Sequence, residues 1–242
     1  MTEANAGNRK QNRGKLYGVG VGPGDPELLT LKAARLIREA DVIGIPGKNK
    51  ESCVAWQIAV SAVPEMEEKE ILAVSFPMTK DAGILEESHK KGADQTAALL
   101  DMGKNVVFLT LGDPAVYSTY GYLQKRLTER GYEAYMVSGV PSFCAAAARL
   151  GISLGEKSEA LHILPGSYPL KEGLELSGTK ILMKSGKQMR TVKELLLSGK
   201  KKAAMVENCG MAGERVFFSA EEIPEDAGYY SLIIVREGEE TV

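Results

Sequence analysis

Residues 16–40 run LYGVGVGPGDPELLTLKAARLIREA, an apolar stretch joined through a glycine-rich turn to an amphipathic one. After the turn, apolar residues recur every three or four positions, which is the spacing of one helix face. Asp25 and Pro26 are residue types that favour a helix cap and a first helical position. The stretch therefore predicts a strand over Leu16–Val21, a tight turn, and a helix over residues 27–40.

The same alternation continues through the first half of the chain. The apolar runs are nearly unbroken, as expected for a parallel sheet that is covered on both faces. This alternation of strand-like and helix-like segments predicts an α/β domain. Further strands are expected at Asp41–Ile45, Ile71–Val74, Val106–Leu111 and Tyr132–Val137, with helices at about 52–62, 84–102 and 118–130.

The second half is less regular. Two of its strands, near 203–219, are joined by a loop too short for a crossover helix, which predicts a mixed sheet. A helix of small residues, Cys144 to Ala148, and the glycines after it indicate a boundary between the halves. Strands are expected at Leu161–Leu164, Lys180–Met183, Ala203–Val206, Arg215–Ser219 and Ser231–Val235, with a helix near 188–198.

We therefore expect a fold of the α/β class with two α/β domains. A disordered tail over residues 1–14 precedes an N-terminal domain with a parallel sheet over 15–138. A C-terminal domain with a mixed sheet follows over 139–242.

Composition excludes several kinds of protein. The 242 residues carry 44% hydrophobic and 26% charged side chains, as in ordinary globular domains. A net charge of -2 argues against a nucleic-acid surface, and no apolar run is long enough to cross a membrane. The N-terminus lacks the apolar stretch of a secretory signal. Three scattered cysteines and two histidines predict neither disulfides nor a metal site, so a cytoplasmic location is expected.

The turn Gly18–Asp25 does not match a dinucleotide-binding fingerprint. In GxGxxG the third glycine would be Pro23 or Asp25, depending on the starting glycine. A tight strand-to-helix turn and a ligand loop both explain this turn equally well.

Three further junctions carry similar turns. Leu111–Thr119 follows the most apolar strand and contains a second Gly-Asp-Pro bend, after the one at Gly24–Pro26. Because the carboxyl ends of parallel strands meet at one edge of a sheet, both bends should lie at that edge. A helix cap would also explain this turn, as it would Ser138–Phe143, and turn formation would suffice for Val206–Gly210. No nucleophile motif is present, so any chemistry must rest on positioning two reactants, as methyl transfer from a sulfonium does.

Taken in order, these motifs resemble the tetrapyrrole methylase family, the class III S-adenosylmethionine methyltransferases. The family's GxGPGDxxLLT opening matches Gly20–Thr30, its GDPxxY loop matches Gly112–Tyr117, and its GVxS segment matches Gly139–Ser142. A late ENxxxxxxR pattern matches Glu207 to Arg215. Within the family the chain looks most like the C20 methyltransferases that act on precorrin-2 or cobalt-factor II in cobalamin biosynthesis.

The resemblance implies a homodimer, with the active site in the cleft between the two domains. S-adenosylmethionine would bind there and leave as S-adenosylhomocysteine, and a small-molecule tetrapyrrole would be the substrate. The relatives often have glycine where this chain has Cys209, which would leave a backbone contact there at best. The implied cofactor contacts are Pro23, Leu111, Gly112, Asp113, Val116, Ser142 and Phe143. The resemblance also implies contacts at Lys184, Ser185 and Cys209, where the match to the family's motifs is weaker.

Asp113 is the candidate general base for loss of the C20 proton. A structural role, in which its carboxylate caps backbone amides of the turn, would explain this residue equally well. The substrate's carboxylates should meet cations, for which Lys48, Lys50, Lys184, Lys187 and Arg190 are candidates; a solvated surface would also explain them.

Three alternatives stay open. The first is methylation at another ring position, such as C11 or C17, or of the uroporphyrinogen III type. The second is a nucleotide-dependent oxidoreductase, against which the failed fingerprint argues. The third is a tetrapyrrole carrier without catalysis.

Overall fold

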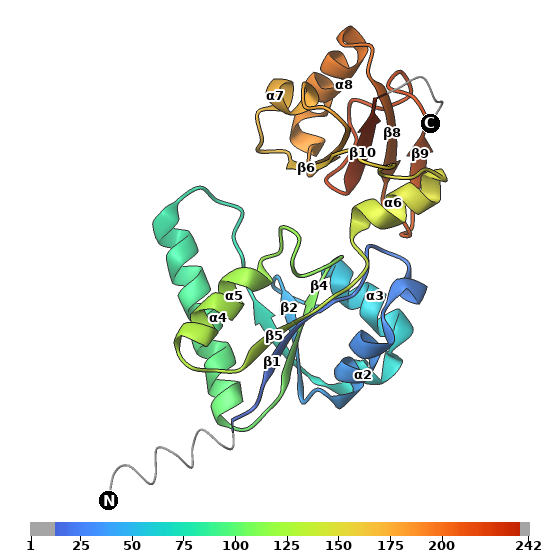
Figure 1. Cartoon of the computed structure of the whole chain (residues 1–242). Helices are drawn as coiled ribbons and strands as arrows, with labels where there is room; N and C mark the ends of the chain where they lie inside the picture. The colour runs from blue at the N-terminus through green and yellow to red at the C-terminus, as the bar shows by residue number, and fades with distance from the viewer. Residues whose placement is uncertain (1–12, 238–242) are drawn as a thin grey trace, which may run out of the picture. The chain divides into compact units, whose positions relative to one another are not determined.

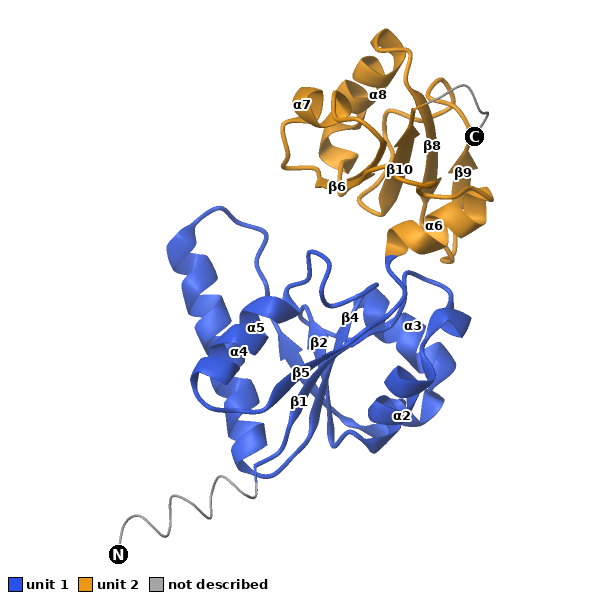
Figure 2. Ribbon diagram, in the orientation of Figure 1, with its two compact units in different colours: residues 1–141 blue, residues 142–242 orange. Residues whose placement is uncertain are grey.

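The computed structural model describes residues 13–237. The chain forms two compact units, residues 1–141 and 142–242 (Figure 2). The division falls just after the boundary expected at Ser138. Most of the tail expected over 1–14 lies outside the described residues. Of the two that are described, Arg13 pairs with Asp101 at 2.8 Å and Gly14 N donates to Leu100 O.

The first unit is built on a parallel five-stranded sheet of order β3-β2-β4-β1-β5, as predicted. All five expected strands are confirmed to within about two residues at each end. They are β1 (Leu16–Gly20), β2 (Val42–Pro46), β3 (Glu70–Val74), β4 (Val106–Thr110) and β5 (Ala134–Val137).

Helices cover both faces of this sheet (Figure 1). One face packs against α2 and α3, the other against α4 and α5, and each interface is a core of buried aliphatic side chains. The two cores explain why the strands are apolar almost without interruption. The helices are α2 (Leu31–Glu39), α3 (Val54–Ala62), α4 (Ala82–Asp101) and α5 (Tyr120–Glu129), with 3-10 turns η1 (Pro26–Leu28) and η2 (Pro64–Glu68).

The helix predicted over 27–40 is wrong at its start. Asp25 caps the 3-10 turn η1, accepting from Glu27 N at 2.8 Å, and Pro26 is the first residue of that turn. The α-helix begins one turn later, after Thr30, whose Oγ1 accepts from Ala33 N at 3.1 Å. Two successive capping residues thus break what the apolar spacing presents as one helix.

The second unit holds a mixed sheet of order β6-β7-β10-β8-β9, again as predicted. Only β6 and β7 pair in parallel. The strands are β6 (Leu161–Pro165), β7 (Thr179–Met183), β8 (Lys202–Glu207), β9 (Arg215–Phe217) and β10 (Ser231–Arg236). The helices are α6 (Ser142–Leu150), α7 (Leu170–Leu174) and α8 (Met189–Ser198), with a 3-10 turn η3 (Gly186–Gln188).

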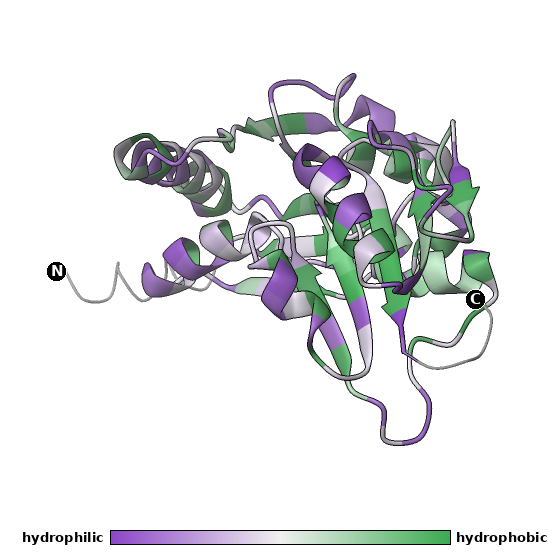
Figure 3. Ribbon diagram, turned by 90° about the horizontal axis from the view of Figure 1, so that it is seen from above, coloured by the Kyte–Doolittle hydropathy of each residue, from purple (hydrophilic) through white to green (hydrophobic). Residues whose placement is uncertain are grey.

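Two helices of this unit differ from expectation. α6 runs for 9 residues and so extends beyond the small-residue stretch at both ends, while the 5-residue α7 was not anticipated because it is too short to show periodicity. In both units the strands are mainly hydrophobic and the helices carry mixed faces (Figure 3). Within residues 13–237, no helix combines the length and apolarity that a membrane span requires.

Candidate functional site

The order of the first sheet creates a switch point between β1 and β4. These strands are neighbours, yet the chain leaves β1 toward the α2 face and leaves β4 toward the α5 face. Ligands of open parallel sheets bind at such a point, beyond the carboxyl ends of the strands. The two Gly-Asp-Pro bends follow these two strands.

The two bends are bound directly to each other. Gly112 N donates to Gly22 O at 2.8 Å, and Gly22 N donates to Gly112 O at 3.3 Å. Both glycines have positive φ angles, 78° and 71°, which side-chain-bearing residues rarely adopt. The prediction that both bends lie at one edge of the sheet is confirmed.

The segment after β5 closes against the same bends. A Cβ built on Gly139 would overlap Gly112 O and come within 2.8 Å of Gly20 Cα. A Cβ on Gly20 would in turn lie 2.5 Å from Gly112 O and 2.6 Å from Gly139 N. The three backbones meet only because none of them carries a side chain at this place.

Asp113 holds this cluster together. The residue is 9% exposed, its Oδ1 accepts from Ala115 N at 2.7 Å, and its Oδ2 accepts from Gly139 N at 3.0 Å. One oxygen therefore shapes its own turn and the other ties that turn to the segment after β5. Both oxygens are engaged with backbone donors, which is the geometry of a positioning residue.

The other predicted residues of the first unit lie on the same loops. Pro23 is buried in the first bend, while Leu111 and Val116 are half-buried in the second. Val116 N donates to Asp113 O at 3.2 Å. Tyr117, which ends the GDPxxY pattern, has a φ of 46° and is 46% exposed. A non-glycine residue in that conformation marks a constrained loop.

The remaining predicted contacts belong to the second unit. Ser142 and Phe143 form the first turn of α6, and the Phe143 ring is buried. Lys184, with a φ of 59°, and the buried Ser185 follow β7, whereas Cys209 follows β8 and is half-buried.

The late ENxxxxxxR pattern has a structural explanation. Glu207 and Arg215 are opposite partners in the β8–β9 ladder, and Arg215 Nε donates to Glu207 Oε2 at 2.7 Å. Glu207 Oε1 accepts from Gly228 N. The buried carboxylate thus anchors two segments beside Asn208, whose φ is 52°.

The candidate substrate cations are dispersed. Arg190 pairs with Glu225 at 3.0 Å, and the Lys50 ammonium lies 5.3 Å from the centre of the Trp56 ring. Lys48 and Lys187 are exposed. Lys48 and Lys50 belong to the first unit, whereas Lys184, Lys187 and Arg190 lie between β7 and the start of α8 in the second.

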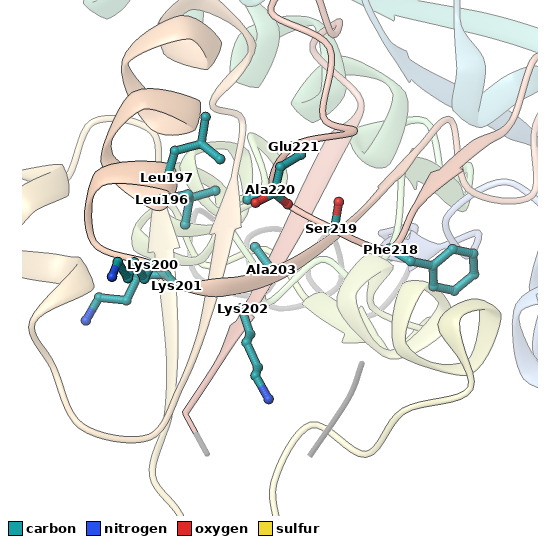
Figure 4. A pocket seen from close by; sticks show the side chains of 10 residues that line it. All are labelled: Leu196, Leu197, Lys200, Lys201, Lys202, Ala203, Phe218, Ser219, Ala220 and Glu221. Atoms are coloured by element: carbon teal, nitrogen blue, oxygen red, sulfur yellow. The ribbon is translucent and has the colours of Figure 1, made fainter. Parts of the chain in front are cut away.

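The second unit contains a hollow of about 320 Å³ beside the start of β8 (Figure 4). Lys202 on its wall begins β8, whereas Cys209 follows the other end of that strand. Among the described residues, no group of three or more His, Cys, Asp or Glu side chains is arranged to hold a metal ion.

His89 lies in a group of rings that no sequence motif indicated. Its imidazole stacks on the Tyr122 ring, with centroids 4.5 Å apart and an interplanar angle of 14°, and meets the Phe76 ring at 5.8 Å. Burial, and then the nearby Arg126 guanidinium, lower the pKa of His89, against a smaller opposite effect of Glu86. The contacts join residues far apart in the chain, so no local pattern could have revealed them.

We expect His89 to titrate below the ordinary histidine pKa of about 6.5. Because the unfolded chain then binds the proton more readily, this residue's contribution to stability is complete above that value and is lost as the pH falls through the lowered pKa. Imidazole resonances followed by NMR across the acid range test this, with a His89→Gln variant separating His89 from His162. A midpoint at or above the ordinary value would contradict it.

Comparison with known proteins identifies a family for the chain. A model of the family described as Tetrapyrrole (Corrin/Porphyrin) Methylases matches residues 15–224. The chain is 36% identical over 239 residues to the cobalamin biosynthesis protein CobIJ of Mycobacterium tuberculosis, covering 93% of the chain and 46% of the relative. The chain therefore spans about half the length of CobIJ.

Two shorter relatives match over most of their length. One is a probable cobalt-precorrin-2 C(20)-methyltransferase of Methanocaldococcus jannaschii, 38% identical over 71% of this chain and 72% of the relative. The other is a precorrin-2 C(20)-methyltransferase of Sinorhizobium, 30% identical over 92% and 95%.

Solved structures agree on the fold. The uroporphyrin-III C-methyltransferase of Thermus thermophilus, complexed with S-adenosylhomocysteine, superposes with a TM-score of 0.69 at 26% identity, covering 93% of this chain and 98% of that one. A cobalt precorrin-4 methyltransferase gives a TM-score of 0.71 at 22% identity over 95% and 96%.

Proposed function

The chain belongs to the tetrapyrrole methylase family, and from that premise we propose that it transfers a methyl group from S-adenosylmethionine to C20 of precorrin-2 or cobalt-factor II, as a step of cobalamin biosynthesis. The C20 position is supported by the relatives from Methanocaldococcus and Sinorhizobium, whose names carry it. The observation that carries the proposal is the glycine-lined junction of three loops at the switch point of the parallel sheet.

The residues of this junction fit S-adenosylmethionine. Gly20 and Gly139 let the loops pack backbone against backbone where a Cβ would overlap, and Asp113 keeps the second and third loops in register. Pro23, Leu111, Gly112, Asp113 and Val116 would line this part of the cofactor site. Ser142, Phe143, Lys184, Ser185 and Cys209 would contribute from the second unit.

When bound, S-adenosylmethionine supplies a methyl group that is already activated by the positive sulfur. The electron-rich C20 of the reduced ring is the nucleophile, and its proton is lost after the new carbon–carbon bond forms. The protein's contribution is to hold the two reactants in line, which accounts for large rate enhancements in other systems. Asp113 remains a candidate base for that proton, although its two amide contacts favour positioning of the loops.

We expect the protein to convert precorrin-2 or cobalt-factor II to a product carrying one additional methyl group when S-adenosylmethionine labelled with ¹³C in its methyl group is present. Carbon NMR of the product should place the label at C20. Label at C11 or C17 would establish another ring position. Label transferred to uroporphyrinogen III in a parallel incubation with that compound would establish the alternative that the Thermus neighbour supports.

Binding measurements test the alternatives outside the family's chemistry. A carrier would bind the ring but show no saturable affinity for S-adenosylhomocysteine, and an oxidoreductase would bind a nicotinamide nucleotide instead. We also propose that the protein acts in the cytoplasm as a homodimer, which light scattering of the purified protein would test by its mass.

A further inference from the structure

The second bend leads directly into a pair of stacked rings. After the bend, the chain enters α5 at Tyr120, and the first turn of that helix presents Tyr122, which is 55% exposed. The Tyr122 ring lies nearly parallel to the imidazole of His89, which comes from α4. Both helices run back from the carboxyl edge of the parallel sheet toward the next strand (Figure 1), with Tyr122 in the first turn of α5 and His89 about two turns into α4.

A third ring extends the pair toward the sheet. Phe76, just after β3, meets His89 at 5.8 Å and meets Phe108 on β4 edge-on at 6.1 Å and 85°. We call Phe76, His89 and Tyr122 the aromatic platform. It extends along the carboxyl edge from the end of β3 to the start of α5, on the face of the sheet that α4 and α5 cover.

A second observation marks the same place. Thr110 is the last residue of β4, two positions after Phe108 and therefore on the same face of the sheet. Its Oγ1 is buried and has no hydrogen-bond partner anywhere in residues 13–237. A buried hydroxyl without a partner is costly. The polar atom lies on the same face of the sheet as Phe108, at the end of the strand that leads into the second bend.

The charges around the platform suit an anionic ring. The lowered pKa of His89 leaves the imidazole neutral at neutral pH, so the stacked faces carry no charge. The charged groups that act on it are Arg126 from α5 and Glu86 from α4, which are paired with each other. Lys90 pairs with Asp94 at 3.0 Å, whereas Lys91 on α4 and Lys125 on α5 are exposed, as is Glu87.

We propose that Tyr122 and His89, stacked beside the loop that follows β4, contact the face of the tetrapyrrole and determine which of its carbons lies next to the methyl donor. The inference rests on the proposed function, since it requires a flat polycarboxylate substrate. It makes these two side chains specificity-determining residues of the same reaction.

The test compares Tyr122→Leu and His89→Leu with the wild-type enzyme. We expect each leucine variant to raise KM for precorrin-2 by up to about tenfold, because stacking of the ring is lost. Affinity for S-adenosylhomocysteine should stay unchanged. Tyr122→Phe should restore KM, since it keeps the ring. Phe218→Leu, which alters a comparably exposed ring (53%) in the second unit, should leave all constants at their wild-type values.

Binding gives an independent measurement. Uroporphyrin III, a stable planar octacarboxylate, can be titrated by its fluorescence, and its Kd should rise about tenfold in both leucine variants. Tyr122 is exposed, so Tyr122→Leu decides the question even if His89→Leu does not fold. Wild-type KM and Kd in Tyr122→Leu would overturn the platform while leaving the proposed function intact. Absence of methyl transfer by the wild-type enzyme would overturn the proposed function itself.

Discussion

Gly139→Ala is expected to lose most of the affinity for S-adenosylhomocysteine and to destabilise the first unit. The added Cβ would overlap Gly112 O and crowd Gly20, and these neighbours are backbone, which cannot rotate away. Overpacking of this kind costs about 1–3 kcal/mol. Displacement of the loops should reduce affinity at least about tenfold. Calorimetric titration and thermal unfolding measure the two effects.

Gly121→Ala is the matched control. A Cβ on Gly121 meets nothing within 4 Å, and the residue lies inside α5, where alanine is favoured over glycine by roughly 0.5–1 kcal/mol. This variant should bind S-adenosylhomocysteine as the wild type does and unfold at an equal or higher temperature. Wild-type affinity in Gly139→Ala would show that the junction of the three loops does not hold the cofactor.

Asp113→Asn is expected to weaken binding of S-adenosylhomocysteine by about 10- to 100-fold. Asparagine keeps one acceptor oxygen, so a side-chain N–H would face either Ala115 N or Gly139 N. A hydrogen bond to a charged group contributes about 1.5–3 kcal/mol, which corresponds to that range. Asp113→Ala removes both acceptors and should have the larger effect in the same titration.

The kinetic result separates two roles for Asp113. A general base would leave cofactor affinity nearly unchanged in Asp113→Asn and lower kcat, by about 10²–10⁴-fold. A positioning residue would lower affinity and stability together. Retention of affinity with a large loss of kcat would therefore contradict the positioning role and establish the base that the sequence suggested.

The sequence alone was sufficient for the strands, for most of the helices and for the class of fold. Unbroken apolar runs predicted buried parallel strands, and the short β8–β9 connection predicted the mixed sheet. These signals are local, since periodicity and loop length involve residues close together in the chain. The placing of both bends at one edge also followed, because strands of a parallel sheet share an orientation.

Helix starts were less predictable, as the region after Asp25 illustrates. Asp25 and Thr30 each cap a different turn, and apolar spacing alone does not distinguish one helix from a 3-10 turn followed by a helix. Which of the two forms depends on how Leu28 and Leu29 pack after the first bend.

Only the tertiary structure decided which groups meet at the site. Asp113 reaches Gly139, 26 residues away, because β1 lies between β4 and β5 and carries no side chain at Gly20. The stack of His89 on Tyr122 and the unpartnered hydroxyl of Thr110 likewise depend on the packing of helices against the sheet. A residue's type and spacing define its local backbone, whereas its distant partners depend on strand order, which no local pattern encodes.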